Sequence, residues 1–203
     1  GSTGSASQTP CAAGTYQPST GQSSCIDSSV GHYVGSTGSS SQTPCTVGTY
    51  QPSTGQSSCT DASAGYYVDT TASTTQTACA VGTYQPSTGQ SSCTDASAGY
   101  YVDTTASTTQ TACAVGTYNS NTGSTSSSAC IDASAGYYVG STGSASQTPC
   151  AAGTYQPSTG QSSCIDSSVG HYVGSTGSSS QTPCTVGTYQ PSTGQSSCTD
   201  ASA

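Results

Sequence analysis

The sequence predicts an all-β protein with little regular secondary structure, built as an elongated tandem array of 17-residue disulfide-stapled β-hairpins. Three observations predict it. A 17-residue pattern recurs eleven complete times in 203 residues, cysteine returns in every second repeat to make a 34-residue double unit, and Phe, Trp and Met are absent. Fixed-period self-similarity is typical of stacked arrays in which each repeat contacts its neighbours.

The repeat boundaries follow from the cysteines. We number each repeat from its first cysteine position, so that glycine stands at position 4, tyrosine at position 6 and a turn near position 11. The double repeats span 11–44, 45–78, 79–112, 113–149 (with a three-residue insertion) and 150–183; a partial sixth spans 184–203, and 1–10 is the end of a truncated repeat. Residues 1–64 are identical to 140–203. We interpret the chain as a window from a longer array.

The charge balance excludes several classes of partner. The chain has no Lys or Arg and a net charge of −8. It therefore lacks the cations that bind nucleic-acid phosphates or anionic lipid heads. No apolar run approaches the roughly 20 residues of a membrane span. We expect no nucleic-acid partner and no membrane insertion; the expected partners are neighbouring repeats and copies of the chain in a filament.

The Ser/Thr-rich composition alone is equally typical of a flexible, disordered stalk. The fixed register of Cys, Gly and Tyr argues against that alternative, because a disordered linker needs no register. Order in so polar a chain has to come from covalent staples and from repetition.

The twelve cysteines have the pattern of structural disulfides. Their spacings alternate between 14 and 20 residues, apart from 17 between Cys113 and Cys130. Zinc ligands usually come in close pairs, which are missing here. No Cys-x-x-Cys motif is present for thiol exchange, and no Lys or Arg is available to lower the pKa of a thiol. An even number of cysteines in a core-poor chain indicates disulfides made in an oxidising compartment.

The repeat itself indicates which cysteines pair. In alternate repeats both cysteine positions are lost together, as at Ser28 and Gln42 or Ala62 and Gln76. A bridge between different repeats would leave partners stranded, so the pairing is expected within repeats, where each closed loop stabilises by about 3 kcal/mol. The expected pairs are Cys11–Cys25, Cys45–Cys59, Cys79–Cys93, Cys113–Cys130, Cys150–Cys164 and Cys184–Cys198.

The motif Cys-x-x-Gly-Thr-Tyr-x-x-x-x-Gly-x-x-x-Cys, as in residues 11–25, resembles the ephrin-receptor-like cysteine-rich repeat of extracellular and surface proteins. That family usually has Cys-x-x-Cys at each junction, and half of the expected cysteines are missing here, as in the run from Cys25 to Ser28. The resemblance covers the whole chain. It implies an elongated, disulfide-stapled extracellular array without catalysis.

Each repeat is expected to form a short hairpin clamped at its base by the disulfide. Its two strands would be Gly-Thr-Tyr-Gln and Gln-Ser-Ser-Cys, joined by the turn from Pro18 to Gly21. Pro presets the backbone of a turn, and Gly accepts the left-handed conformation that follows a type I turn. Ala72 and Ala106 replace that Gly, so their hairpins are expected to be looser.

Tyrosine at position 6 is expected to form a packing ladder between repeats, since the chain offers no other large side chain for a core. The alternative is that these tyrosine rings stack against carbohydrate. Gly at position 4, such as Gly14, would allow a close backbone approach beneath each ring. The ladder comprises Tyr16, Tyr33, Tyr50, Tyr67, Tyr84, Tyr101, Tyr118, Tyr138, Tyr155, Tyr172 and Tyr189.

No residue pattern indicates a catalytic or metal site. Calcium takes roughly six to eight oxygens, and the single aspartate that stands two residues after the second cysteine of each pair falls short, so these aspartates are expected to form turns or cap the backbone. His32 and His171 share a position that tyrosine fills elsewhere, which favours surface packing. We expect no enzyme activity, no metal and no cofactor. The aspartates are Asp27, Asp61, Asp95, Asp132, Asp166 and Asp200.

Ser and Thr gather at the turns beside Pro or Gly, a pattern typical of O-glycosylated stalks. Simple solubility of the hydroxyls is the alternative. The candidate sites for O-linked glycans are Ser19, Thr20, Ser36, Thr37, Thr70, Thr71, Thr74 and Thr75.

These observations together predict a structural repeat segment of an extracellular fibre, filament or cell-surface appendage, with O-linked glycans. The alternative is the stalk of an adhesin, or a repeat protein that binds ice or carbohydrate. Ice binding would need Thr in register on one face, whereas the turn positions mix Ser, Thr, Gly, Asp and Ala. A thermal-hysteresis assay separates ice binding from the structural role.

Overall fold

The computed structural model describes residues 8–202 and consists of short β-hairpins, one in each 17-residue repeat. Each hairpin is a two-stranded antiparallel sheet. Residues 8–202 contain no α-helix and one 3-10 helix, η1 (Ser127–Ala129). The strands are β1 (Thr15–Tyr16), β2 (Ile26–Asp27), β3 (His32–Tyr33), β4 (Thr43–Pro44), β5 (Thr49–Tyr50), β6 (Thr60–Asp61), β7 (Tyr66–Tyr67), β8 (Thr77–Ala78), β9 (Thr83–Tyr84), β10 (Thr94–Asp95), β11 (Tyr100–Tyr101), β12 (Thr111–Ala112), β13 (Thr117–Tyr118), β14 (Ile131–Asp132), β15 (Tyr137–Tyr138), β16 (Thr148–Pro149), β17 (Thr154–Tyr155), β18 (Ile165–Asp166), β19 (His171–Tyr172), β20 (Thr182–Pro183), β21 (Thr188–Tyr189) and β22 (Thr199–Asp200).

The all-β array of hairpins agrees with the prediction, but the strands are shorter than expected. In the first hairpin Thr15 pairs with Asp27 and Tyr16 with Ile26, as suits β-branched and aromatic residues. The second strand begins only after Cys25, so the predicted strand Gln-Ser-Ser-Cys belongs to the loop. The Gln17 side chain accounts for this, because it bonds backbone groups on both arms of the loop.

The position of the disulfide also differs from a clamp at the open base of the hairpin. Cys25 immediately precedes β2 and therefore lies on the loop side of the ladder. Cys11 reaches it because a turn precedes β1, in which the Thr15 N–H donates to the Ala12 carbonyl at 3.0 Å. The bridge thus closes a loop that includes β1, while β2 lies just outside it.

Position 11 holds the left-handed residue that the turn pattern predicts. Gly21 has φ +74°, a conformation that glycine adopts without a steric penalty. Ala72 and Ala106 keep the same left-handed conformation, with φ of 55° and 56°, and the expectation that their hairpins are looser stays a prediction. The Ala72 N–H also keeps the inter-repeat hydrogen bond of this position, to the Cys45 carbonyl at 2.8 Å.

The three-residue insertion is absorbed within one loop. In the repeat that begins at Cys113, η1 takes up the extra residues, while Thr117 still pairs with Asp132 and Tyr118 with Ile131. The hairpin register therefore survives an altered loop length.

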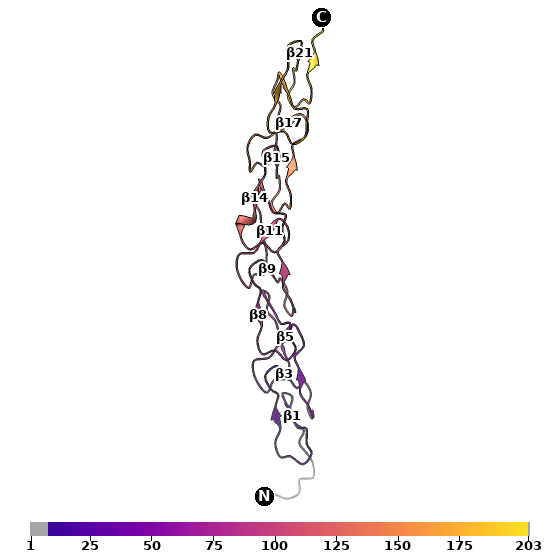
Figure 1. Cartoon of the computed structure of the whole chain (residues 1–203). Helices are drawn as coiled ribbons and strands as arrows, with labels where there is room; N and C mark the ends of the chain where they lie inside the picture. The colour runs from indigo at the N-terminus through magenta and orange to yellow at the C-terminus, as the bar shows by residue number, and fades with distance from the viewer. Residues whose placement is uncertain (1–7, 203) are drawn as a thin grey trace. The chain divides into compact units, whose positions relative to one another are not determined.

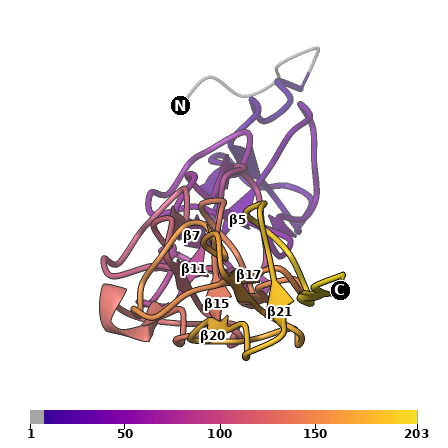
Figure 2. The ribbon, with the colours of Figure 1, turned by 90° about the horizontal axis from the view of Figure 1, so that it is seen from above.

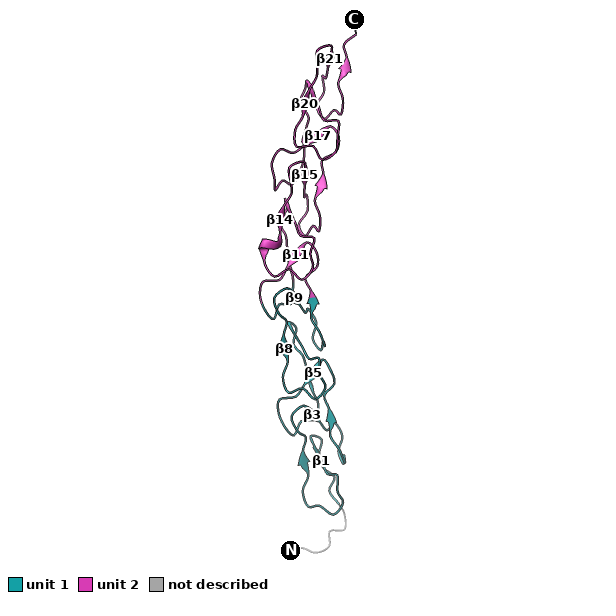
Figure 3. Cartoon of the chain, in the orientation of Figure 1, with its two compact units in different colours: residues 1–94, 105–109 teal, residues 95–104, 110–203 magenta. Residues whose placement is uncertain are grey.

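The chain divides into two compact units (Figure 3). Unit 1 comprises Gly1–Thr94 and Thr105–Thr109, and unit 2 comprises Asp95–Thr104 and Gln110–Ala203. Within unit 1 the hairpins of β1, β3 and β5 follow one another in chain order (Figure 1). Within unit 2 the strands β15, β17 and β21 also follow in order (Figure 1), and seen from above they lie near one another in projection (Figure 2). Each unit is therefore a stack of hairpins.

The truncated repeat expected at 1–10 lies mostly outside the described residues. The other repeat boundaries stay predictions, and the division between the two units falls inside the double repeat 79–112.

Candidate functional site

The most regular feature of the structure is the junction between successive repeats, which is made by the backbone. In unit 1 the Gly48 N–H donates to the Val68 carbonyl at 2.7 Å, and the Gln51 N–H donates to the Ser73 carbonyl at 3.0 Å. The Ala62 N–H returns a bond to the Gly48 carbonyl at 2.8 Å. The same pattern recurs along both units. Backbone bonds are independent of side-chain identity, so one geometry serves repeats of different composition.

Glycine at position 4 makes this junction possible. Gly48 has φ +84°, and a Cβ atom at this residue would collide with the carbonyl of Gly89, two repeats further along. The expected close approach at position 4 is therefore present, but the group that approaches is a backbone carbonyl rather than a tyrosine ring. Each repeat thus contacts both the next repeat and the one after it.

Besides the glycines of position 4, the buried residues lie at positions 1 and 7 of the repeat, which the sequence pattern did not indicate as core. Position 1 alternates between cysteine and a small residue, and position 7 alternates between an amide and valine. Both are small enough to fit between closely spaced backbones. The buried residues are Cys11, Ser28, Cys45, Ala62, Cys79, Ala96, Cys113, Ala133, Cys150 and Ser167 at position 1, and Val34, Gln51, Val68, Gln85, Val102, Asn119, Val139, Gln156, Val173 and Gln190 at position 7.

The buried glutamines at position 7 brace the cystine loops. Gln85 is only 7% exposed. Its Nε2 donates to the Ser92 carbonyl at 2.8 Å, and its Oε1 accepts from the Ser87 N–H at 3.1 Å. The amide therefore replaces the ladder bonds that two extended strands would make. In the repeat with the insertion, Asn119 takes this place and donates to Ser124 Oγ at 2.8 Å.

A second glutamine replaces the disulfide in the cystine-free repeats. Gln76 stands at position 15, where the other repeats have their second cysteine, and its Oε1 accepts from the Ser63 N–H at 2.7 Å. Gln42, Gln110 and Gln147 make the same bond in their own repeats, also at 2.7 Å. In the repeats that lack both cysteines, a hydrogen bond accepted by the glutamine side chain therefore takes the place of the disulfide.

The structure joins the twelve cysteines in six pairs, each within one repeat, with Cα–Cα distances between 5.6 and 5.9 Å. No cysteine is left free. The pairs are Cys11–Cys25, Cys45–Cys59, Cys79–Cys93, Cys113–Cys130, Cys150–Cys164 and Cys184–Cys198.

The tyrosines of position 6 are half-buried rather than central. Every ring of the row is partly accessible, and Tyr189 is 50% exposed. The core is therefore elsewhere, although packing between repeats by these rings stays a prediction. Some tyrosines of position 5 reach further, because the Tyr100 hydroxyl lies beside Gly143 and the Tyr137 hydroxyl beside Gly177, each two repeats away.

The aspartates that follow the cysteines do not have the turn or capping role expected of them. Asp27 and Asp61 lie in strands and are exposed. Within residues 8–202 neither carboxylate makes a hydrogen bond. Asp27 faces the turn glycine Gly55 instead. His32 is half-buried, with Nδ1 3.1 Å from the Val30 carbonyl.

The described residues contain no group of three or more His, Cys, Asp or Glu side chains that could hold a metal ion. In the same range no helix has the length and apolar character needed to cross a bilayer. The candidate glycan sites Ser19, Thr20, Ser36, Thr37, Thr70, Thr71, Thr74 and Thr75 are all exposed.

Comparison with known proteins matches the repeat to one family. The model of the tyrosine-protein kinase ephrin type A/B receptor-like family matches residues 1–45, 31–79, 65–113 and 136–184. Together these matches cover well over half of the chain and omit most of the repeat that carries the insertion. No curated protein matches the chain. Disulfide-rich repeats of this family are typically non-catalytic and indicate an extracellular structural repeat region. The chain belongs to the tyrosine-protein kinase ephrin type A/B receptor-like family, as a tandem array of its cysteine-rich repeats.

Proposed function

We propose that this chain is a structural segment of an extracellular fibre, filament or cell-surface appendage, and that it has no catalytic activity. The observation that carries the proposal is the recurrent junction. Each repeat uses its buried positions and its backbone donors to hold the next repeat, and little of the repeat is left over to build a site that occurs once. Such an array provides length, which can be increased by adding repeats without a new core.

Covalent staples support an extracellular location, because disulfides persist in oxidising compartments. Each cystine-free repeat lies between two cystine repeats, so the hydrogen-bonded staples have covalent ones on both sides.

We further propose that the exposed loops carry O-linked glycans. Ser19 and Thr20 lie at the tip of a cystine loop next to Pro18, and all three are exposed. No hydrogen bond engages either hydroxyl within residues 8–202. A glycan layer would also cover exposed apolar side chains such as Val30 and Ile26, which are 43% and 45% exposed.

The location is tested by immunogold electron microscopy of intact cells that make the protein, with antibodies raised against the folded chain. The proposal expects gold particles along filaments or hairs outside the cell. Labelling confined to the cell interior would contradict it. Glycosylation is tested separately, by mass spectrometry of loop peptides from native material. We expect loop peptides that are heavier by the mass of one or more sugars, and this added mass should be lost on alkaline β-elimination. If all loop peptides are unmodified, the glycan layer is refuted.

A further inference from the structure

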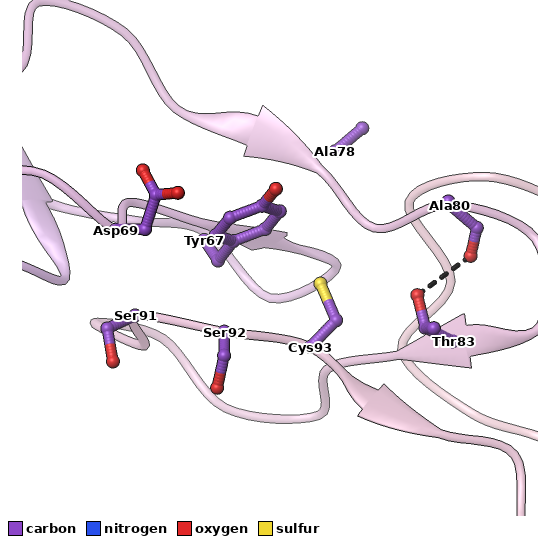
Figure 4. A pocket seen from close by; sticks show the side chains of 8 residues that line it. All are labelled: Tyr67, Asp69, Ala78, Ala80, Thr83, Ser91, Ser92 and Cys93. Carbon is purple, nitrogen blue, oxygen red and sulfur yellow. Dashed lines mark hydrogen bonds between the residues drawn. The ribbon is translucent and has the colours of Figure 1, made fainter.

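A shallow hollow lies beside Tyr67, where a cystine-free repeat meets the following cystine repeat in unit 1. Its volume is about 430 Å³, within the range of roughly 300–1,000 Å³ that small-molecule sites occupy. The Tyr67 ring borders one side and Cys93 another (Figure 4). The hollow is therefore large enough for a small ligand and has an aromatic wall.

The same hollow recurs in unit 2. It has a volume of about 450 Å³ and is bordered by Tyr138 and Cys164. Tyr138 stands at position 6 of its repeat, as Tyr67 does, and Cys164 stands at position 15, as Cys93 does. Two units that pack separately thus build one geometry from the same repeat positions. The hollow is a property of the repeat and not of one local irregularity.

The lining of the first hollow combines an apolar surface with unused polar groups. Ala78, Ala80 and the cystine sulfur extend the apolar surface next to the Tyr67 ring. Thr83 does not contribute a free hydroxyl, because its Oγ1 donates to the Ala80 carbonyl at 2.8 Å. That bond is drawn in Figure 4.

Two polar side chains of this lining, those of Tyr67 and Asp69, remain available to a ligand, while the Ser91 and Ser92 side chains point away from the Tyr67 ring (Figure 4). Within residues 8–202 no protein group bonds the Tyr67 phenol, the Ser91 and Ser92 hydroxyls or the Asp69 carboxylate. An aromatic side chain provides an apolar face together with a polar tip. A pyranose ring has a matching character, with one face of C–H groups and a rim of hydroxyls that donate and accept hydrogen bonds.

Charge narrows the class of sugar. The chain has no Lys or Arg, and Asp69 lies at the edge of the hollow. No Lys or Arg in any of these hollows would neutralise a carboxylate or a sulfate, and beside Tyr67 and Tyr101 the aspartate of position 8, Asp69 or Asp103, would also repel an anion. A neutral sugar meets no such barrier.

We propose that these recurrent hollows bind neutral pyranose sugars, with the ring stacked on the tyrosine of position 6. Hollows lie beside Tyr67 and Tyr138. Because five cystine-free repeats precede a cystine repeat, we expect equivalent sites at Tyr33, Tyr101 and Tyr172 as well. The inference does not rest on the proposed function, because the sites are built from the polypeptide alone. The sugar has two possible sources, the glycans of other molecules or an O-linked glycan on a neighbouring hydroxyl such as Thr70.

The test uses the full chain, produced without glycans and with its six disulfides formed. Saturation-transfer NMR measures binding of methyl mannoside, methyl galactoside and methyl N-acetylglucosaminide, with methyl glucuronide as the anionic comparison. One variant changes the five site tyrosines to Leu. A matched control changes Tyr16, Tyr50, Tyr84, Tyr118 and Tyr155 to Leu, which are five tyrosines of the same position in the cystine repeats. A third variant changes the site tyrosines to Phe, which keeps the aromatic face.

We expect at least one neutral glycoside to bind the unmodified chain, and binding to fall at least fivefold in the site-Leu variant. The control and the Phe variant should retain binding to within about twofold, and the glucuronide should bind at least fivefold more weakly than the neutral sugar. Disulfide mass mapping shows that each variant has folded. The proposal is overturned if no neutral glycoside binds the unmodified chain, or if the control loses binding as fully as the site-Leu variant.

A second experiment, on native material, distinguishes the two possible sources of the sugar. If an O-linked glycan of the chain fills the hollows, added glycoside should bind only after the glycans have been removed. If the hollows serve glycans of other molecules, added glycoside should bind the native chain directly. Failure to bind in both states would refute the sites without affecting the structural role of the array.

Discussion

At the scale of the residue, glycine and the small side chains decide whether repeats can stack. Position 4 needs a positive φ and has no room for a side chain, because the backbone of the repeat two further along the chain lies against it. Position 11 needs a positive φ alone, which two alanines also adopt. Both positions therefore favour glycine, and position 4 does so more strongly because a side chain there would also collide with backbone.

Changing Gly48 to Ala should strongly destabilise the stack around it. The new Cβ would meet the Gly89 carbonyl, and the residue would keep a φ of +84° that side chains rarely adopt. Strain of this kind costs about 1–3 kcal/mol before the collision is counted. Gly35 is the matched control, because its φ is not positive and a Cβ there would lie 3.5 Å from the Tyr33 ring. Thermal unfolding should show a lower midpoint for G48A and little change for G35A; equal effects would contradict the account.

Changing Ala72 and Ala106 to Gly should stabilise the chain. An L-residue in the left-handed region costs roughly 1–2 kcal/mol, while the extra freedom of unfolded glycine offsets roughly 0.5–1 kcal/mol. The net gain should be about 0.5–1 kcal/mol at each site, measured by urea unfolding. The control is Ala78 to Gly in strand β8, which should destabilise by a similar amount. Stabilisation by the control, or destabilisation by A72G, would show that the turn is not strained.

At the scale of the element, each repeat is a loop with a staple, and two chemically different staples hold the same geometry. The disulfide joins positions 1 and 15 in one kind of repeat, and a glutamine amide at position 15 bonds the backbone at position 2 in the other. The backbone around both is alike, since the ladder keeps one register in both kinds, as for Thr49 opposite Asp61 and Tyr66 opposite Ala78.

A designed staple follows from this equivalence. Changing Ala62 and Gln76 together to Cys should create a seventh disulfide, because the same two positions are bridged in the repeats on either side. Closing a loop of about 15 residues should stabilise by about 3 kcal/mol. Mass spectrometry with thiol labelling should find no free cysteine, and the unfolding midpoint should rise.

The control for this design changes Gln42 and Ala62 to Cys, which places the two thiols in different repeats. That pair should stay reduced when the folded protein is oxidised gently. Two free thiols in the first variant, or a bridge in the control, would show that the cystine-free repeats do not share the loop geometry.

Much of the element could be predicted from the sequence, because the repeat carries its own control. The joint loss of Cys at positions 1 and 15 indicated which cysteines pair, and the Pro-x-x-Gly run indicated the turn. The role of Gln85 could not be predicted, because an amide at this position is usually exposed and its burial depends on the backbone of the adjacent repeat. The partner of Gly48 lies two repeats away, and a single repeat contains no signal of which group approaches it.

At the scale of the whole molecule, function follows from repetition. The chain has no Lys or Arg to pair with its aspartates and no Phe, Trp or Met to fill a core. It is stabilised by backbone junctions, small buried side chains and covalent loops, and each of these recurs with the repeat. A surface site built by the repeat also occurs several times along the chain. Five sugar sites of low affinity would therefore act together on a glycan-bearing partner.

Each disulfide closes a loop inside its own repeat, and force spectroscopy of the single chain tests this pairing most directly. With the disulfides intact, the length of the fully extended chain should not include the residues closed off in the six loops. Reduction under force should then release roughly 4 nm for each 14-residue separation, taking about 3.5 Å per residue less the 5.8 Å already spanned by the cysteine Cα atoms. The loop of Cys113–Cys130 should release roughly 5 nm, because its separation is 17 residues. Six steps of these lengths would support the account, and steps of roughly 6–7 nm, the length of the 20-residue gaps between repeats, would contradict it.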